Sequence, residues 1–296
     1  MQAVLPARES YVPVGGARLF ARELGQGPPI VVLHGGPELD HRYLLPELDR
    51  LAGSFRLVYY DQRGRGRSAD GVSPEDVTLD SELADLESIR RHFGLARVAV
   101  LGHSWGGLLA MEYAVRHPDR VSHLVLLNTV PASHAGFLRL RAELRERRAP
   151  GEVEAMEAIA AGDRYRRGDL DAEAEYLRLH FRTALREPRH LEAILGRLRE
   201  SFTPETVLKA RAIDHRLGEE TWESEHFDLH PALRELDVPT LVLHGEDDFI
   251  PVELAAHVAD SIPHALLTVL PECGHFSYLE RPEAVQRSVA ALFARS

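Results

Sequence analysis

Residues 97–107 read Arg97-Val-Ala-Val-Leu-Gly-His-Ser-Trp-Gly-Gly107, and this stretch decides the fold. A short valine-rich run, typical of a buried strand, leads into the Gly-x-Ser-x-Gly sequence around Ser104, and an apolar segment with helical character follows. Glycines on both sides of Ser104 let a strand and a helix approach without Cβ clashes. The pattern predicts a sharp strand-to-helix turn that exposes the Ser104 hydroxyl as a nucleophile, with a helix-capping serine as the alternative.

Apolar runs of the same kind occur on both sides of this stretch. Strands are predicted at Ile30–Leu33, Arg56–Tyr60, Val98–Leu101, Leu124–Leu127, Thr240–Leu243 and Leu266–Leu270. Helices are predicted at Asp80–Phe93, Ser104–Arg116, Val252–Ser261 and Pro282–Ala294. A hairpin, Tyr11–Val14 and Ala17–Glu23 around Gly15-Gly16, is expected before them. Strands that alternate with helices predict an α/β fold with a mostly parallel central sheet flanked by helices.

The alternation stops between Pro131 and His226, where the composition changes. In this segment 36 of 96 residues are charged, against 45 of the other 200. Its pieces have the pattern of amphipathic helices, at Gly136–Arg148, Glu152–Ala161, Leu170–Leu185, Pro188–Ser201 and Pro204–Leu217. We therefore expect a core in two parts, residues 1–130 and 227–296, with an inserted helical cap at 131–226.

A serine hydroxyl needs a general base, and the base needs an acid that orients it. Asp247 and Asp248 follow the predicted strand at 240–243, and His275 follows the one at 266–270. Both loops leave the carboxyl ends of strands, where open α/β sheets bind ligands. We predict His275 as the base and Asp248 as the acid, with Asp247 as the alternative acid.

Acyl transfer also needs hydrogen-bond donors for the oxyanion. One is expected from the backbone N–H of the residue after the nucleophile, which is Trp105, and one from the loop after an early strand. His34-Gly35-Gly36-Pro37 follows the predicted strand at 30–33, and glycine lets the backbone approach a substrate. We assign the donors to Trp105 and Gly36, with Gly35 as the alternative.

Composition excludes several classes of function. The 296 residues carry a net charge of −11, which offers nothing to neutralise the phosphates of DNA or RNA. No apolar run is long enough for a membrane helix, and Met1–Ser10 lacks the pattern of a leader, so we expect a cytoplasmic protein. Cys273, the single cysteine, is predicted to be a buried thiol.

No metal or cofactor is expected. His226 and His230 have helical spacing, but the glutamate of a zinc-protease motif is missing. Gly35-Gly36 and Gly64-x-Gly66 lack the residues that make phosphate-binding loops. The expected partner is a small molecule or a short peptide, and the oligomeric state is left open.

These residues together resemble a known family. His34–Pro37, Asp61-Gln-Arg-Gly-Arg-Gly-Arg-Ser68, Gly102–Gly107 and the loops with Asp248 and His275 are similar to the α/β-hydrolase superfamily, specifically its proline iminopeptidase branch. The resemblance implies a helical cap over the site, a Ser104–Asp248–His275 triad, and removal of an N-terminal residue, often proline, without a metal. Within the second motif we interpret Asp61, Arg63 and Arg67 as structural.

The sequence departs from that branch at Glu38, where the family usually has glycine after His-Gly-Gly-Pro. Such aminopeptidases hold the substrate ammonium with carboxylates of the cap, because a buried cation needs a paired anion. Glu38 and Glu223 are the candidates here, Glu223 because Trp222-Glu223 is similar to a Trp-Glu pair of the family. Exposed glutamate at a cap boundary is the alternative for Glu223.

The leading hypothesis is therefore a metal-free serine hydrolase, most similar to a proline iminopeptidase, that acts on small amides or peptides. A carboxylesterase or lactonase with the same triad is the first alternative, and it would need no ammonium-binding carboxylate. A non-catalytic ligand-binding protein of the same fold is the second.

Overall fold

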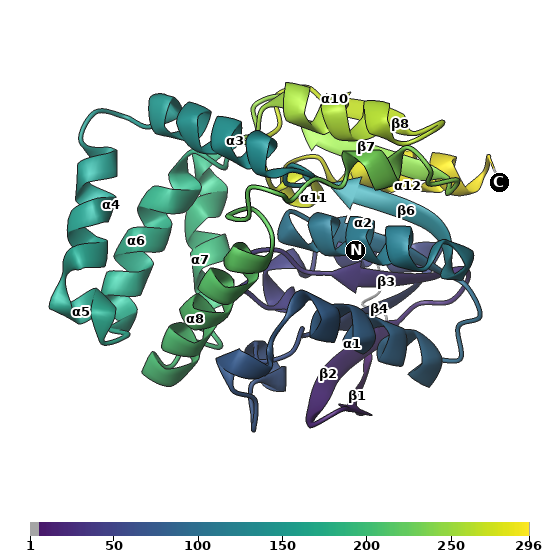
Figure 1. The fold of residues 1–296 in the computed structure, drawn as a ribbon, viewed down its shortest axis with the longest axis horizontal. Coiled ribbons are helices and arrows are strands. Elements are labelled where there is room, and N and C mark those ends of the chain that lie inside the picture. Colours follow the sequence, from purple (N-terminus) through teal and green to yellow (C-terminus); the bar gives the residue numbers. More distant parts are fainter. Residues whose placement is uncertain (1–5, 296) are drawn as a thin grey trace.

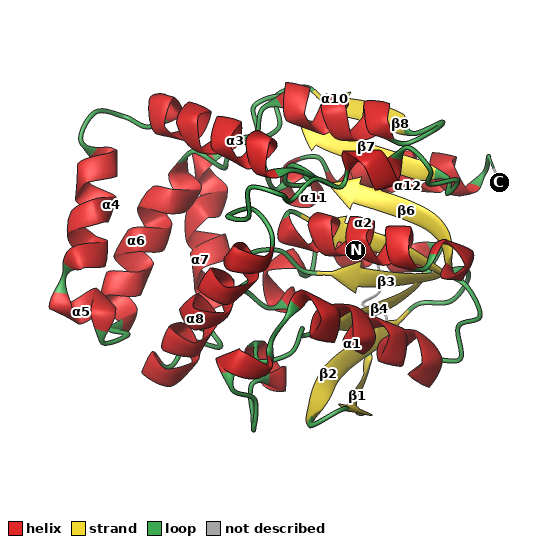
Figure 2. Ribbon diagram, viewed as in Figure 1, coloured by secondary structure: helices red, strands yellow, loops and turns green. Residues whose placement is uncertain are grey.

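The centre of the molecule is an eight-stranded sheet (Figure 2). The computed structural model describes residues 6–295. Its strands are β1 (Arg8–Val14), β2 (Ala17–Leu24), β3 (Pro29–Leu33), β4 (Arg56–Tyr60), β5 (Val98–His103), β6 (Val121–Leu127), β7 (Thr240–Gly245) and β8 (Leu266–Leu270). They lie in the order β1-β2-β4-β3-β5-β6-β7-β8, and all neighbours from β4 to β8 are parallel. The hairpin β1–β2 joins β4 antiparallel.

The parallel strands β3 to β7 are buried on both faces, as their apolar runs predict. On β3, Val31 and Leu33 belong to one hydrophobic cluster, and Ile30 and Val32 belong to the other. The first cluster includes residues of α1 (Leu79–His92), α2 (Trp105–Arg116) and α10 (Val252–Ser261). The second includes residues of α12 (Pro282–Phe293). The sheet is therefore the middle of three layers.

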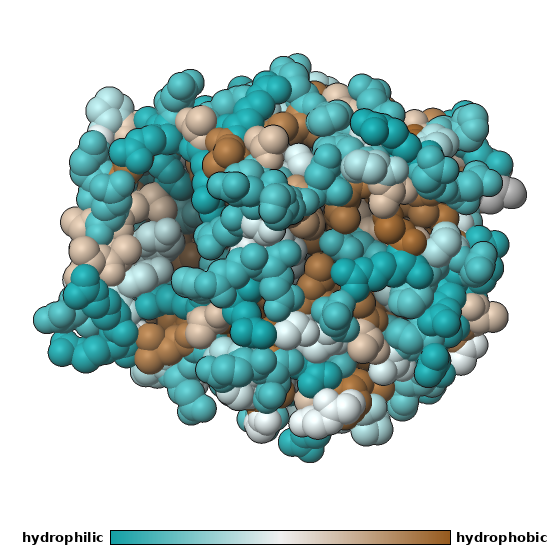
Figure 3. Space-filling view, viewed as in Figure 1, coloured by the Kyte–Doolittle hydropathy of each residue, from teal (hydrophilic) through white to brown (hydrophobic). Residues whose placement is uncertain are grey.

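Helices inserted between β6 and β7 lie beyond the carboxyl ends of the strands (Figure 1). They are α3 (His134–Arg147), α4 (Glu152–Ala161), α5 (Asp163–Arg166), α6 (Leu170–Arg182), α7 (Leu191–Arg199) and α8 (Pro204–Glu220). The short helices α9 (His230–Leu233) and α11 (Ser277–Glu280) belong to the core. We call α3–α8 the cap. Figure 3 shows a largely hydrophilic face that is hollowed over α6, between α4 and α3.

The predicted α/β fold is confirmed, and most predicted elements lie within a few residues of the observed ones. Two helices begin elsewhere. The helix predicted from Ser104 begins at Trp105, because Ser104 has a non-helical backbone. The helix predicted at Pro188–Ser201 opens with a 3₁₀ turn, and α7 begins at Leu191.

Three four-residue helices, α5, α9 and α11, were not predicted, since one turn is too short for a periodic pattern. Of the segment Met1–Ser10, in which no leader is expected, residues 1–5 lie outside the described residues. Among residues 6–295, no helix has the length and apolar character needed to cross a membrane.

Candidate active site

Ser104 occupies a strained turn between β5 and α2. Its φ is 56° and its ψ is −119°, a region that costs a non-glycine residue about 1–3 kcal/mol. The turn closes because the flanking glycines have no side chain: a Cβ on Gly102 would lie 2.1 Å from the carbonyl oxygen of Gly106, and a Cβ on Gly106 would lie 2.4 Å from that of Leu33. Ser104 is half-buried, and its hydroxyl has no hydrogen-bond partner among the described residues.

His275 lies in the loop after β8 and is buried. Its Nδ1 is 3.0 and 3.1 Å from the two carboxylate oxygens of Asp248, in the loop after β7. Its backbone N–H donates to the carbonyl oxygen of Ala184, at the end of the segment that follows α6. Ser104 and His275 line the same cavity. The structure thus brings the predicted nucleophile, base and acid to one place.

Asp248 is fully buried and held as an anion. It accepts hydrogen bonds from Asn128 Nδ2 (2.8 Å) and from the Ile250 backbone N–H (2.9 Å). Burial alone would raise the pKa of Asp248, but the nearby imidazoles of His275 and His244 and the hydrogen bonds from His275 and from the Ile250 N–H lower it to about 2. A carboxylate held in this way can orient a histidine and stabilise an imidazolium.

Asp247, the alternative acid, points away from His275. Its carboxylate is exposed and forms an ion pair with Arg186 at 3.1 Å. The structure thus brings Asp248, and not Asp247, to the base.

The two glycines of the 34–37 loop have different roles. The Gly35 N–H donates to the Tyr43 hydroxyl at 2.7 Å, so it is not free for an oxyanion. The N–H groups of Gly36 and Trp105 have no acceptor among the described residues. Gly36 has a φ of +70° and lines the same cavities as Ser104. This arrangement favours Gly36 and Trp105 over Gly35 as donors.

Tyr43 and His103 connect these loops, and sequence reasoning missed both of them. The Tyr43 hydroxyl lies 2.7 Å from His103 Nδ1, and His103 Nε2 lies 3.0 Å from the carbonyl oxygen of His275. Burial, with the nearby charge of His275, lowers the pKa of His103 to about 3, so its ring is neutral. A neutral ring accepts from Tyr43 and donates to His275 through Nε2. These hydrogen bonds connect the loop that contains Gly35 and Gly36 to the loop that contains His275.

Two adjoining cavities meet at Ser104. One, of about 50 Å³, has an aromatic wall that includes Tyr43, Phe181, Phe249 and Phe276 beside His275. The other, of about 290 Å³, extends along α6 and α8. They share Gly36, Glu38, Ser104 and His180.

Three carboxylates face the larger cavity: Glu38, Glu173 of α6 and Asp214 of α8. Glu173 pairs with Arg211, whereas Glu38 and Asp214 have no basic partner among residues 6–295. Burial, with the charge of Asp214, raises the pKa of Glu38 to about 8. Burial, with the charge of Glu223, raises the pKa of Asp214 to about 6. This wall is suited to a cation.

Glu223 is not brought into this cavity, which differs from its predicted role. Its side chain is 45% exposed and lies 3.3 Å from Arg141. Trp222 lines the cavity instead, 5.5 Å from the ring of Trp105. The chain turns after α8, so the side chains of Trp222 and Glu223 face in opposite directions. Sequence reasoning missed Asp214. This residue lies four residues after Ala210 and three residues before Leu217, on the inner face of the amphipathic helix α8.

The motif at 61–68 forms a buried support beneath the site. Arg63 makes paired hydrogen bonds to Asp85, at 2.9 and 2.6 Å. Gln62 accepts from the indole N–H of Trp105 at 3.2 Å and donates to the carbonyl oxygen of His34 at 2.9 Å. Arg67 stacks on Phe20. These contacts agree with the structural role expected of the motif.

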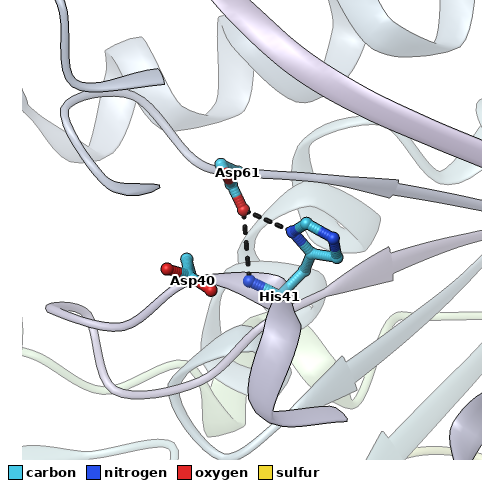
Figure 4. Close-up of side chains that lie close together, drawn as sticks. All are labelled: Asp40, His41 and Asp61. Carbon is cyan, nitrogen blue, oxygen red and sulfur yellow. Dashed lines mark hydrogen bonds and ion pairs between the residues drawn. The ribbon is translucent and has the colours of Figure 1, made fainter. Parts of the chain in front are cut away.

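Asp40, His41 and Asp61 form a buried cluster whose side-chain atoms are close enough to hold a metal ion (Figure 4). The donors are already engaged within the protein, however. Asp61 accepts from His41 Nδ1 at 2.6 Å and from the backbone N–H of Arg67 at 2.8 Å. Asp40 pairs with Arg42 at 2.7 Å. The arrangement is that of a structural network.

Two other residues of the sequence analysis lie away from this chemistry. His226 is exposed and outside any helix, so it does not share a helical face with the buried His230. Cys273 is a buried free thiol, as predicted.

Comparison with known proteins supports the assignment of the fold. A family model described as alpha/beta hydrolase fold matches residues 28–282. A proline iminopeptidase from Saccharolobus solfataricus is 28% identical over 93% of this chain and 88% of its own. The crystal structure of a proline iminopeptidase from Mycobacterium smegmatis is 25% identical, covers 97% of this chain and 98% of its own, and has a TM-score of 0.72. A thermophilic esterase from Thermogutta terrifontis is 26% identical with the same coverage and a TM-score of 0.71.

Proposed function

The chain belongs to the alpha/beta hydrolase fold family and is a hydrolase, and from this premise we propose that it is a serine hydrolase in which Ser104, His275 and Asp248 form the triad. The observation that carries the proposal is the pairing of His275 Nδ1 with both oxygens of a buried, multiply hydrogen-bonded Asp248, on one cavity with Ser104. The chemistry uses groups of the protein alone.

His275 takes the proton of the Ser104 hydroxyl as the oxygen attacks the substrate carbonyl. The bond between Asp248 and Nδ1 leaves Nε2 as the nitrogen that accepts this proton. The tetrahedral intermediate collapses when His275 returns the proton to the leaving group, and water then repeats the sequence on the acyl-enzyme. The imidazolium formed in each step is stabilised by Asp248.

The N–H groups of Gly36 and Trp105 are assigned as the hydrogen-bond donors to the negatively charged oxygen of the tetrahedral intermediate. Trp105 is the first residue of α2, so the helix N-terminus adds its partial positive charge. Removal of one such donor typically lowers kcat by about 10² to 10³.

We further propose that the substrate carries a free N-terminal ammonium, as for a proline iminopeptidase. Two carboxylates without a basic partner, Glu38 and Asp214, face the cavity beside Ser104. A desolvated ammonium requires such anions. The proline iminopeptidases among the relatives agree with this substrate class. Glu38 and Asp214 replace the pair Glu38 and Glu223 that the sequence predicts.

An esterase is the second candidate, because the smaller cavity is aromatic and a related solved structure is an esterase. Its wall at Phe181, Phe249 and Phe276 suits an uncharged acyl group.

Turnover of prolyl-naphthylamide beside p-nitrophenyl acetate and p-nitrophenyl butyrate distinguishes the two candidates. An aminopeptidase cleaves the prolyl substrate and leaves N-acetyl-prolyl-naphthylamide intact, since acetylation removes the ammonium. Ser104→Ala is the control for contaminating enzymes. Turnover of the esters alone would favour the esterase, and binding without turnover would favour the non-catalytic alternative.

A further inference from the structure

Glu38 lies where the cavities next to Ser104 meet. It lines the aromatic cavity beside His275 and the larger cavity along α6 and α8. It also lines a third, small cavity of about 30 Å³, where the cap faces Gly64–Gly66. It is the one residue common to all three cavities, and it borders both of those that meet at Ser104.

The Glu38 carboxyl also lies against the proposed oxyanion donor Gly36. A Cβ built on Gly36 would be 3.0 Å from Glu38 Oε2, so the carboxyl oxygen is close to the Gly36 backbone. A negative charge at that place opposes the negative charge that develops on the substrate oxygen, because both lie in a cavity with little water.

Among the described residues no cation forms an ion pair with Glu38, although the charge of Arg65 acts on it. Arg65 is held by Glu82, Gln62 and the carbonyl oxygen of Arg63, and Arg211 is held by Glu173 and the carbonyl oxygen of Tyr165. The ionised carboxyl accepts a hydrogen bond from its own backbone N–H, but it lacks a cationic partner until a ligand supplies one.

We propose that Glu38 couples the charge of the substrate to the oxyanion hole, so that an ionised, unpaired Glu38 slows the hydrolysis of neutral substrates and a substrate ammonium relieves this effect. The proposal rests on the serine hydrolase mechanism and on Gly36 as a donor. It makes Glu38 a specificity-determining residue that acts by penalising substrates without a cation.

Burial sets the pH at which this effect appears. The groups that face Glu38 from the core are Asp40, Tyr43, Arg65, His103 and His275. Those that face it from the cap are Tyr165, Glu173, Tyr176, His180, Arg211 and Asp214. Burial and the negative charges among them raise the Glu38 pKa from its ordinary value of 4.5 to about 8. Without a bound cation the carboxyl is neutral below that pH and ionised above it, so neutral substrates lose rate as the pH rises through about 8. A bound substrate ammonium favours the ionised carboxyl and so lowers this pKa.

The test is kcat/KM for p-nitrophenyl butyrate between pH 6.5 and 9.5, corrected with Ser104→Ala, and for prolyl-naphthylamide at pH 7. We expect the ester value of the wild type to fall roughly tenfold or more above pH 8. Glu38→Gln should abolish this fall while it lowers turnover of the prolyl substrate. Glu225→Gln, which changes an exposed carboxylate, should behave as the wild type.

A fall above pH 8 that persists in Glu38→Gln, or a flat wild-type profile, would overturn the proposal. Glu38→Gly, the residue usual in the resembled branch, serves as the second variant if Glu38→Gln does not fold. If neither enzyme turns over the prolyl substrate but the ester profiles differ as expected, the aminopeptidase proposal fails and the role of Glu38 at the oxyanion hole is supported.

Discussion

The strand-end loops and the cap supply different parts of this site. Ser104 and Asp248 follow the buried parallel strands β5 and β7, and His275 follows the parallel edge strand β8. The sheet and the hydrogen bonds between these loops therefore fix the position of each residue. Glu173 and Asp214 lie on helices that reach the site only by tertiary packing. This difference implies that the triad residues of the core determine whether any substrate reacts, while the carboxylates of the cap, together with Glu38 of the core, determine which substrate is preferred.

The largest expected effect comes from Ser104→Ala, which should lower kcat by on the order of 10⁶ for prolyl and ester substrates alike. The loss is general because every substrate needs the nucleophile. Steady-state kinetics on both substrates, with thermal unfolding as a check of the fold, provide the measurement. A variant that loses one substrate class and keeps the other would contradict the division between core and cap.

Asp248→Asn should lower kcat by roughly 10⁴ on both substrates, because an amide cannot hold His275 in the reactive tautomer. Asp247→Asn is the matched control. Its carboxylate makes only an exposed pair with Arg186, and such pairs contribute about 1 kcal/mol or less. We expect that variant to stay within about threefold of the wild type in kcat. The reverse order of effects would assign the acid to Asp247.

The core was predictable from sequence because its signals are local. Apolar runs of strand length located the sheet, and two glycines around one serine located the turn. The sequence favoured Asp248 over Asp247 but left Asp247 open, since adjacent residues in a loop differ only in the direction that tertiary contacts give them. Asn128 and the Ile250 N–H decide it, and neither appears as a motif.

The cap was predictable only in outline. Charge density and amphipathic periodicity located its helices, but they could not show which of 19 acidic residues face the cavity. Asp214 carries a weak signal, a carboxylate on the inner face of α8. Glu223 was chosen for its place beside Trp222, and the turn after α8 directs it outward.

Asp214→Asn tests the cap side of the comparison. We expect kcat/KM for prolyl-naphthylamide to fall about 30-fold or more, since an unpaired buried ammonium costs about 2–5 kcal/mol, and the ester to change less than about threefold. The wild-type ratio of prolyl to ester turnover should also decrease as the pH falls through about 6, because the Asp214 pKa is raised to about 6 and protonation removes its charge. The ester serves as the reference because both substrates need His275, so any pH dependence that comes from this base cancels in the ratio. Equal losses on both substrates would show general damage to the cavity.

The smallest effect is expected from Glu223→Gln, and it sharpens the comparison within the cap itself. Glu223 is nearly half exposed and pairs with Arg141 on the surface, where solvent screens the pair to about 1 kcal/mol or less. Its one link to the site is electrostatic, because its charge contributes to the raised pKa of Asp214. Removal of that charge lowers the Asp214 pKa and makes the proposed anchor slightly more anionic, so prolyl turnover should change by less than about threefold, and its fall at acidic pH should begin at a lower pH than in the wild type. A loss on the prolyl substrate as large as that of Asp214→Asn would instead place Glu223 against the ammonium, and the cavity wall would then have to be formed by a different conformation of the segment after α8.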